Sequence, residues 1–559
     1  MAERNFEAPG PGTWELDTTH FAKPRTLYSS EGMKQGFERG FREGTERYGL
    51  FLDYLMSEQL HGFSYSKVVL AFVPPDAPPG PPSEGFFDQP ALIARFENGK
   101  KAIENKIWHE DMQRWDDEIK PDSIRRNRQL QQVQPETLDS EALIQHLVDC
   151  YENLNEMTYR HHLFTIPSLI PVGLYIGKAC EWTGADAGEA LNLLKGSSPV
   201  SLGLAAAELT EIGCLLRQEK IDRDRFKGLS PTDELESLSK LPNPIGIAIE
   251  QYIDIVGYQL TSGYDITERF ALEMPEILVG NIWSSRKEKD SRAELDAHQQ
   301  RVTDFRNRVP AVHRAEFDSL LQEARFINRL RDERGVYNES RALGLSRRAV
   351  LEAGSRLQNS GRLNNAAAML QASHEEMLAM LAGNDKPDQA ELDDREDWYQ
   401  TRTTEDAPLF LGPAPSPPPP LEALPENARL AQSAIGAALG NLFDPPVEAD
   451  QSDNRIKGVS VSSESYEGIA RIINNPDDFH RLQQGDVLVT RNTSASFNVV
   501  LPMLGAIVTD RGGQLSHAAI IAREYGIPAV VSTRNATRVI EDGARVRVDG
   551  KSGTVTVLS

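Results

Sequence analysis

Cysteine is scarce in this chain of 559 residues, and the few that occur are far apart. Cys150, Cys180 and Cys214 form no CxxC pair. This spacing excludes a disulfide framework and a cysteine zinc site, so we predict no metal centre. Reduced and unpaired thiols are typical of a cytoplasmic protein.

The sequence also lacks long apolar runs. No stretch of about 18 apolar residues occurs, so we expect no transmembrane helix. Residues 1–9 lack the basic start and the apolar core of a signal peptide. Both absences favour a chain that folds in an aqueous compartment.

Positive charge is in deficit, since the formal net charge is −23. An acidic chain is a poor match for nucleic acid or for an anionic membrane. Residues 455–559 contain 12 Lys and Arg against 10 Asp and Glu, so they carry +2 and the preceding part carries −25. This difference indicates two kinds of domain, although solubility of the larger part alone also explains it.

Helical apolar spacing dominates residues 29–380, and alternation with period two is rare there. We therefore predict a mainly helical body. The segments that carry this prediction are 42–60, 140–155, 187–194 and 314–330. The proline-rich segment 73–82 and the charged segment 220–240 are predicted to be loops.

Proline is concentrated in residues 408–425. Proline at that density favours extended polyproline II, a semi-rigid spacer that suits a domain that moves, although an ordinary connector has the same composition. A short helix is predicted at 426–443. The predicted organisation is a helical domain (1–404), a linker (405–454) and a C-terminal domain (455–559).

Residues 455–559 have a different texture, because short apolar runs at 487–489 and 506–508 are of buried-strand type. Valines that alternate with polar residues on both sides of Gly550 and Gly553 predict a β-hairpin. The fold class predicted for the whole chain is therefore multidomain, with a large mainly α-helical N-terminal body and a C-terminal α/β domain.

Residues 505–531 predict a β-α-β unit whose helix begins at His517. Ser516 is a good N-cap, and Gly526 is a good helix stop. His517 then lies in the first turn, where free backbone N–H groups and the helix dipole favour a neutral ring and an adjacent anion. The simpler alternative is that His517 only begins a helix.

The segment resembles the phosphohistidine (swivelling) domain of phosphoenolpyruvate synthase, pyruvate phosphate dikinase and rifampicin phosphotransferase. Matching motifs are Thr509-Asp510, Gly512-Gly513, Ser516-His517-Ala518-Ala519 and the run from Ala522 to Val531. The resemblance implies that His517 is the catalytic phosphoryl carrier. It also implies a phosphate cradle made by Thr509, Gly512, Gly513, Ser516 and Ala518. The family usually has a Gly-x-x-Ala-Ser-x-Gly segment at the start of this domain, and residues 458–463 depart from that pattern.

The enzymes of this family join the histidine domain to an ATP-grasp domain. No long segment with the α+β pattern of an ATP-grasp domain and no GxxxxGK[ST] motif occurs here. We therefore expect ATP and Mg²⁺ to bind to a separate ATP-grasp subunit and not to this chain alone. The arrangement is similar to the histidine-domain subunit of phenylphosphate synthase and of dikinases for hydroxyphenyl ketones (4-hydroxyacetophenone, acetovanillone). This likeness implies a small phenolic acceptor.

Residues 14–25 resemble the opening of the acceptor domain in rifampicin-phosphotransferase-like proteins. Residues 325–361 resemble the helices that precede the histidine domain there. Candidates for the acceptor site are His20, Arg25, His161, His162, Asp265 and Arg269. Adjacent histidines point to different faces of a helix, so at most one of His161 and His162 is expected to face a pocket. Asp265 and Arg269 also fit an i,i+4 surface ion pair, and we regard that as the stronger interpretation.

Two further hypotheses stay open. In one, the chain is a regulatory phosphohistidine carrier with a protein acceptor. In the other, it is a non-catalytic scaffold, although the intact Gly512-Gly513 and Ser516-His517 pairs argue against that role.

Overall fold

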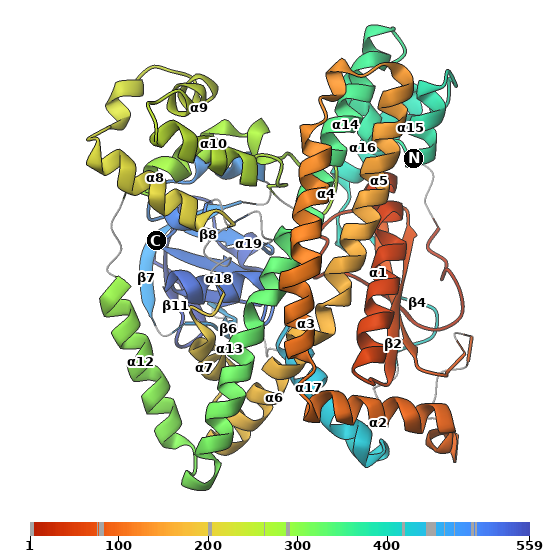
Figure 1. Ribbon diagram of the computed structural model, residues 1–559, viewed down its shortest axis with the longest axis vertical. Helices are drawn as coiled ribbons and strands as arrows, with labels where there is room; N and C mark the ends of the chain where they lie inside the picture. Colours follow the sequence, from red (N-terminus) through yellow and green to blue (C-terminus); the bar gives the residue numbers. More distant parts are fainter. Residues whose placement is uncertain are drawn as a thin grey trace. The chain divides into compact units, whose positions relative to one another are not determined.

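The computed structural model describes residues 5–74, 76–77, 83–198, 204–261, 263–286, 291–415, 420–442, 454–462, 464–473, 476–493, 497 and 500–558. The chain divides into two compact units, which Figure 1 colours by sequence. Unit 1 comprises Met1–Ile170, Gly263–Glu268 and Arg334–Ile435; unit 2 comprises Pro171–Ser262, Arg269–Glu333 and Gly436–Ser559. The domain bounds 1–404, 405–454 and 455–559 stay a prediction; each unit contains helices as well as a sheet.

The centre of unit 1 is a pair of long helices, α1 (Leu27–Arg47) and α5 (Ser140–Leu163), which run side by side (Figure 1). Glycine permits their close approach. A Cβ atom at Gly36 would lie 2.2 Å from the carbonyl oxygen of Asn155, and one at Gly40 would lie 2.5 Å from that of Tyr159. The packing of these backbones therefore fixes the C-terminal end of α5 against α1.

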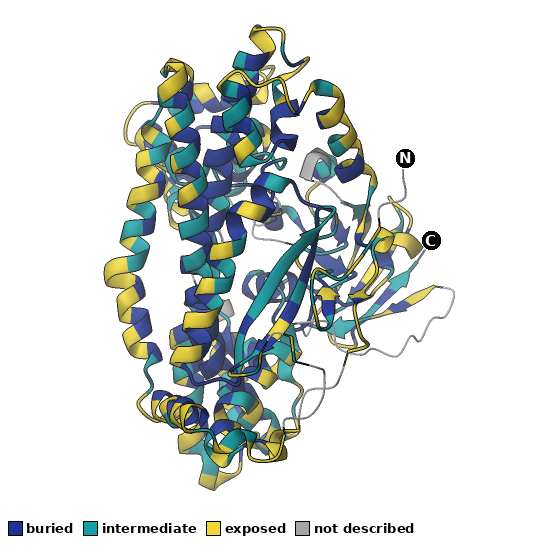
Figure 2. Ribbon diagram, turned by 90° about the vertical axis from the view of Figure 1, so that its right-hand side faces the viewer, coloured by how far each residue is buried: buried dark blue, intermediate teal, exposed yellow. Residues whose placement is uncertain are grey.

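Other helices complete unit 1, and their buried and exposed faces are coloured in Figure 2. They are α2 (Pro90–Glu104), α3 (Trp108–Arg114), α4 (Lys120–Gln132), α14 (Glu339–Asn359), α15 (His374–Leu381), α16 (Gln389–Thr401) and most of α17 (Glu426–Leu442). The helices predicted at 140–155 and 426–443 are confirmed.

Unit 1 also contains a four-stranded sheet in the order β2-β3-β1-β4. Its strands are β1 (Trp14–Leu16), β2 (Leu52–Leu60), β3 (Phe63–Leu70) and β4 (Phe410–Leu411). The helix predicted at 42–60 is therefore wrong beyond the end of α1. His61 and Gly62 have φ of 54° and 85°, and this tight turn folds β2 back on β3. The proline-rich segment 73–82 lies mostly outside the described residues.

Unit 2 begins within α6 (Thr165–Thr183), and its helices confirm the predictions at 187–194 and 314–330. They are α7 (Ala187–Leu191), α8 (Ala206–Gln218), α9 (Pro231–Ser239), α10 (Ile245–Val256), α11 (Pro275–Ser284), α12 (Ser291–Arg308) and α13 (Arg314–Val336). The loop predicted at 220–240 is wrong at its end. Ser230 accepts a hydrogen bond from the Asp233 amide and caps α9, which buries Leu235 and Leu238.

The sheet of unit 2 has the order β5-β12-β11-β7-β8-β9-β10-β6, and its central neighbours β7, β8, β9 and β10 are parallel. Its strands are β5 (Arg455–Lys457), β6 (Val459–Ser460), β7 (Ser465–Ile472), β8 (Val487–Thr490), β9 (Ala506–Thr509), β10 (Ala529–Val531), β11 (Arg545–Asp549) and β12 (Thr554–Val557).

Two short helices cover this sheet on opposite faces. α18 (His517–Tyr525) packs on Leu488 and Ile507. The adjacent strand residues on the other face, Val487, Val489, Ala506 and Val508, pack with Ala536 of α19 (Ala536–Val539). The predicted β-α-β unit and the C-terminal hairpin are confirmed. The fold class is also confirmed, since a mainly helical body is combined with a C-terminal sheet domain.

One helical stretch, Ser140–Thr183, is long and apolar enough to cross a membrane. However, 78% of its most apolar window is buried within the protein. Burial of this extent is typical of a core helix in a soluble protein.

Candidate active site

The first turn of α18 forms the candidate phosphoryl site. The Ser516 side chain accepts a hydrogen bond from the Ala519 amide at 3.4 Å, and Gly526 ends the helix with φ of 66°. The N–H groups of His517 and Ala518 have no hydrogen-bond partner among the described residues. Free amides at a helix start are suited to an anion.

The imidazole of His517 is oriented by a single hydroxyl. Its Nδ1 lies 3.0 Å from Oγ1 of Thr493, which leaves Nε2 as the nitrogen available for chemistry. Burial and, to a smaller extent, the positive charge of Arg331 together lower the pKa of His517 to about 3. The ring is therefore neutral, and hence nucleophilic, at pH 7.

Arg331 was not found from the sequence, because it lies on α13, 184 positions before its contact Leu515. Its guanidinium is buried and donates to the Leu515 carbonyl, and burial lowers its pKa. Nη1 of Arg331 is buried and has no hydrogen-bond partner in the part of unit 2 that the structure describes. A buried cation with an unused donor beside the histidine is suited to bind phosphoryl oxygens.

The glycine loop before the helix contains part of the predicted phosphate cradle, which stays a prediction. Gly512 has φ of 107°, and a Cβ atom there would lie 2.7 Å from Cβ of Ser516. The N–H of Gly513 is not free, because it donates to the carbonyl of Leu442 in the last turn of α17 at 3.1 Å. The Thr509 hydroxyl donates to the Arg511 carbonyl at 2.8 Å. Among the described residues, the amides of His517 and Ala518 and Nη1 of Arg331 are therefore donors without a partner.

Comparison with known proteins agrees with this geometry. Residues 482–553 match the family described as PEP-utilising enzyme, mobile domain. This part of the C-terminal sheet is therefore similar to the PEP-utilising mobile domain. This confirms the resemblance to the phosphohistidine domains, whereas the likeness to phenylphosphate synthase stays a prediction.

Several curated relatives extend the match. An uncharacterized phosphotransferase of Bacillus subtilis is 27% identical over 56% of this chain and 36% of its own length. The rifampicin phosphotransferase of Streptomyces sviceus is 28% identical over 68% of this chain and 42% of its own length. A probable phosphoenolpyruvate synthase of Staphylothermus marinus is 40% identical over 20% of this chain and 13% of its own length. The chain thus spans less than half the length of these relatives.

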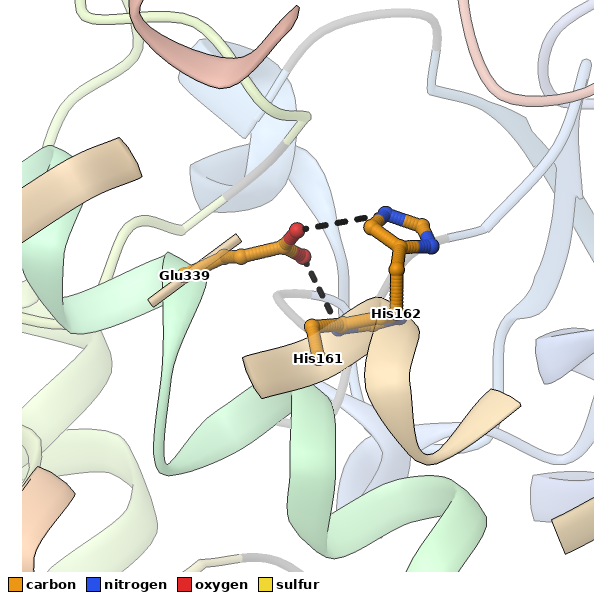
Figure 3. A group of neighbouring side chains, drawn as sticks. All are labelled: His161, His162 and Glu339. Atoms are coloured by element: carbon orange, nitrogen blue, oxygen red, sulfur yellow. Dashed lines mark ion pairs between the residues drawn. The ribbon is translucent and has the colours of Figure 1, made fainter. Parts of the chain in front are cut away.

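Unit 1 contains a second histidine cluster, shown in Figure 3, where α5 ends and α14 begins. Nδ1 of His161 lies 2.9 Å from one carboxylate oxygen of Glu339, and Nε2 of His162 lies 3.6 Å from the other. Both histidines thus contact the same carboxylate, whereas at most one was predicted to face a pocket. Neighbouring helical residues differ in direction by about 100°, so a group placed between the two directions contacts both.

Burial controls the charges in this cluster. It lowers the pKa of His161 and of His162 well below the usual value, so both rings are neutral. The same burial raises the pKa of the Glu339 carboxyl, whose side chain is 2% exposed. Arg334 also depresses the pKa of both histidines, and it donates to the His161 carbonyl at 3.0 Å. Glu339 and Arg334 were both missed by the sequence analysis.

His20 lies on the exposed side of this region. Its Nδ1 lies 2.9 Å from a carboxylate oxygen of Asp17, whose charge raises the pKa of His20. The Glu339 charge acts on the pKa of His20 in the same direction. Of the predicted acceptor-site residues, His161 and His162 therefore contact the Glu339 carboxylate, whereas His20 pairs with Asp17 and is affected only by the charge of Glu339.

Arg25 is buried and has a structural role. Its guanidinium lies 3.9 Å from the centre of the Phe21 ring and donates to the Ser64 hydroxyl at 3.1 Å. Burial lowers the pKa of Arg25 to about 10. These contacts hold the N-terminal segment against β3.

Asp265 is also structural, so the expected surface ion pair is wrong. It is buried and accepts hydrogen bonds from the Thr26 amide at 2.7 Å and the Thr26 hydroxyl at 3.0 Å, at the N-cap of α1. No helix covers residues 263–269, so the i,i+4 geometry does not arise. Arg269 belongs to unit 2, where its carbonyl accepts a hydrogen bond from the Thr261 amide.

Proposed function

We propose that this chain is the phosphohistidine subunit of an ATP-dependent, dikinase-type phosphotransferase. The observation that carries the proposal is the neutral imidazole of His517 at the start of α18, next to two free amides and the buried guanidinium of Arg331. A nucleophile and an anion site are thereby built from one region. The printed names of two relatives, both phosphotransferases, support the same class of reaction.

The first half-reaction loads the histidine. Nε2 of His517 attacks the β-phosphorus of ATP, which is bound with Mg²⁺ on a separate ATP-grasp subunit. The new N–P bond replaces the bond to the α-phosphate oxygen, so AMP leaves and the histidine carries a pyrophosphoryl group. Water then releases phosphate and leaves phosphohistidine. Nδ1 keeps its proton and donates a hydrogen bond to the Thr493 hydroxyl, which leaves Nε2 as the nitrogen that reacts.

The second half-reaction transfers the group to a small hydroxyl compound after the mobile domain swings. The acceptor hydroxyl loses its proton to a base or to solvent, and its oxygen attacks phosphorus in line. The N–P bond breaks and its electron pair returns to Nε2, so His517 leaves as the neutral ring that still holds its proton on Nδ1. Such a transfer depends mainly on positioning and charge neutralisation. Arg331 offsets the charge on the phosphoryl oxygens while they remain on the histidine.

We infer that the acceptor is a phenol and that it binds near the histidine cluster of unit 1. The rings of Phe37 and Phe41 lie 4.5 and 5.2 Å from the His162 ring, so the surroundings are aromatic. A phenol with a para acyl group ionises readily near neutral pH, so it needs little help from a base. The proposal implies a cytoplasmic enzyme of aromatic compound catabolism.

The test is transfer of label from ATP carrying a labelled β-phosphate. With an ATP-grasp partner present, we expect acid-labile label on the wild-type chain and none on His517→Ala. His313→Ala is the matched control, because this partly exposed histidine of the same unit stacks on Trp182 with ring centres 4.8 Å apart. Label that persists in His517→Ala would assign the nucleophile elsewhere. Label that chases to proteins but not to phenols would favour a regulatory carrier, and no label with any partner would favour a scaffold.

A further inference from the structure

Three potential metal ligands converge at the histidine cluster of unit 1. One ligand atom each from His161, His162 and Glu339 lies within 4.8 Å of the other two. Both histidines belong to the last turn of α5, and Glu339 is the first residue of α14, so rigid elements supply all three. Figure 3 shows the two oxygens of the carboxylate directed at the two rings.

The hydrogen bonding of this cluster is incomplete. Nδ1 of His161 and Oε1 of Glu339 are buried and form no hydrogen bond with any described residue. The His161 nitrogen lies only 2.9 Å from the other carboxylate oxygen, yet that contact lacks hydrogen-bond geometry. Buried polar atoms are rarely left without a partner, and an ion held between them is one explanation of such a defect.

The charges of the cluster are compatible with a cation. Metal ligation requires the neutral form of histidine, which burial imposes on both rings. The C-terminal end of α5 contributes the negative end of a helix dipole. The Arg334 charge opposes a cation, but its guanidinium is directed to the His161 carbonyl and to the Thr165 hydroxyl, 3.0 and 2.8 Å away.

We propose that His161, His162 and Glu339 bind one divalent transition metal ion of the zinc class, with a fourth position open to an oxygen ligand. Two imidazoles and one carboxylate are a donor set of catalytic zinc sites, and nitrogen donors disfavour Mg²⁺ and Ca²⁺. Bonds of about 2.0–2.2 Å in a tetrahedron place ligand atoms about 3.4 Å apart. The two histidine–carboxylate contacts, 2.9 Å to one oxygen of Glu339 and 3.6 Å to the other, are close to that separation, and small side-chain shifts would bring the three ligand atoms, now within 4.8 Å of one another, to it. The expectation of no metal, drawn from cysteine alone, overlooked this type of site.

The open position indicates a role, which rests on the proposed function. An acceptor hydroxyl bound to the metal loses its proton more easily, so it attacks phosphohistidine as an oxyanion. The proton leaves to solvent or to a nearby base such as His20. The metal would thus extend the range of acceptors to hydroxyl compounds that do not ionise by themselves at neutral pH.

The test is a titration of the metal-free full-length chain with Co²⁺, followed by its visible absorption. We expect one equivalent to bind with the intense bands of a four- or five-coordinate site, and Zn²⁺ to displace it. His162→Gln and Glu339→Gln should bind at least about 100-fold more weakly. His374→Gln is the control, because this half-buried histidine of the same unit stacks on Tyr151 with ring centres 4.0 Å apart and should bind as the wild type does.

Thermal melting of each variant separates loss of a ligand from loss of the fold, and His162→Gln provides a second test if Glu339→Gln unfolds. The absence of stoichiometric Co²⁺ binding by the wild type, or equal binding by the folded variants, would overturn the site. His517→Ala should bind Co²⁺ normally. Metal binding without His517 labelling would therefore leave the site valid and refute the phosphotransferase, and the reverse result would refute only the metal site.

Discussion

The two histidine sites differ in the helix end and in the charged side chain that lie next to the rings. Burial keeps the rings neutral in both, at His517 and at the pair His161 and His162. His517 lies at the N-terminal end of α18 beside the buried cation Arg331, whereas the pair lies at the C-terminal end of α5 against the carboxylate of Glu339. The helix end and the nearest fixed charge thus adapt the first site to an anion and the second to a cation.

Replacement of Arg331 should have the largest effect on the anion site at His517. Replacing it by Ala removes the cation beside His517, so we expect acid-labile labelling to slow by about 100-fold, in the range seen when a donor to a developing oxyanion is removed. Arg331→Lys should recover part of the rate, because it restores the charge but not the forked donors. Single-turnover labelling measures both rates.

Arg306→Ala is the matched control for this prediction. Its guanidinium is exposed and pairs with Asp318 on the neighbouring helix. Labelling of Arg331→Ala at the wild-type rate would show that the amides of α18 suffice for the anion.

Asp265 tests whether the acidic group at the start of α1 is structural. Asp265→Ala leaves the buried amide and hydroxyl of Thr26 without their acceptor, so we expect the free energy of unfolding to fall by about 2 kcal/mol. Chemical denaturation measures this loss. A full loss of acceptor turnover with unchanged stability would instead return Asp265 to the acceptor site.

Thr493 sharpens the assignment of the reacting nitrogen. Thr493→Val removes the hydroxyl 3.0 Å from Nδ1 of His517, so the ring loses its orientation and its preference for one tautomer. We expect labelling to slow by about 10-fold, comparable to the loss of one hydrogen bond of about 1.4 kcal/mol. Thr493→Ser keeps the hydroxyl and should stay within about twofold of the wild-type rate. Equal rates for Thr493→Val and the wild type would exclude the orienting role.

The smallest expected effect is an absence of titration. The pKa of His517 in the folded chain is about 3, below its value of about 6.5 in an unfolded chain. The folded ring therefore stays neutral between pH 8 and pH 5. The unfolded chain binds a proton at this histidine below about pH 6.5, so the free energy of unfolding decreases as the pH falls from about 6.5 towards 3. NMR of isotope-labelled histidine should show no shift of His517 over that range in the native chain and a full titration after unfolding. Titration of the native signal near pH 6 would contradict the buried, cation-flanked environment.

The local structure around His517 could be predicted from residues that are close in sequence. Ser516 caps α18 and Gly526 ends it, and the apolar runs on both sides return as the parallel strands β9 and β10. Capping, dipole direction and strand pairing in a β-α-β unit depend on contacts within a few turns of chain. The short apolar runs after residue 455 likewise predicted a sheet domain after the helical body, whereas the difference in charge decided nothing by itself.

Tertiary structure alone decided the partners of each histidine. Arg331 reaches α18 from a distant helix, and Glu339 reaches both rings of the unit 1 cluster from the start of α14. The loop amide of Gly513 is occupied by a carbonyl of α17, which no local pattern indicates. The turn at His61 and Gly62 was missed because a two-residue hairpin is a weak signal among helices. Sequence patterns follow local contacts, whereas the charge beside a buried ring depends on which distant backbones pack together.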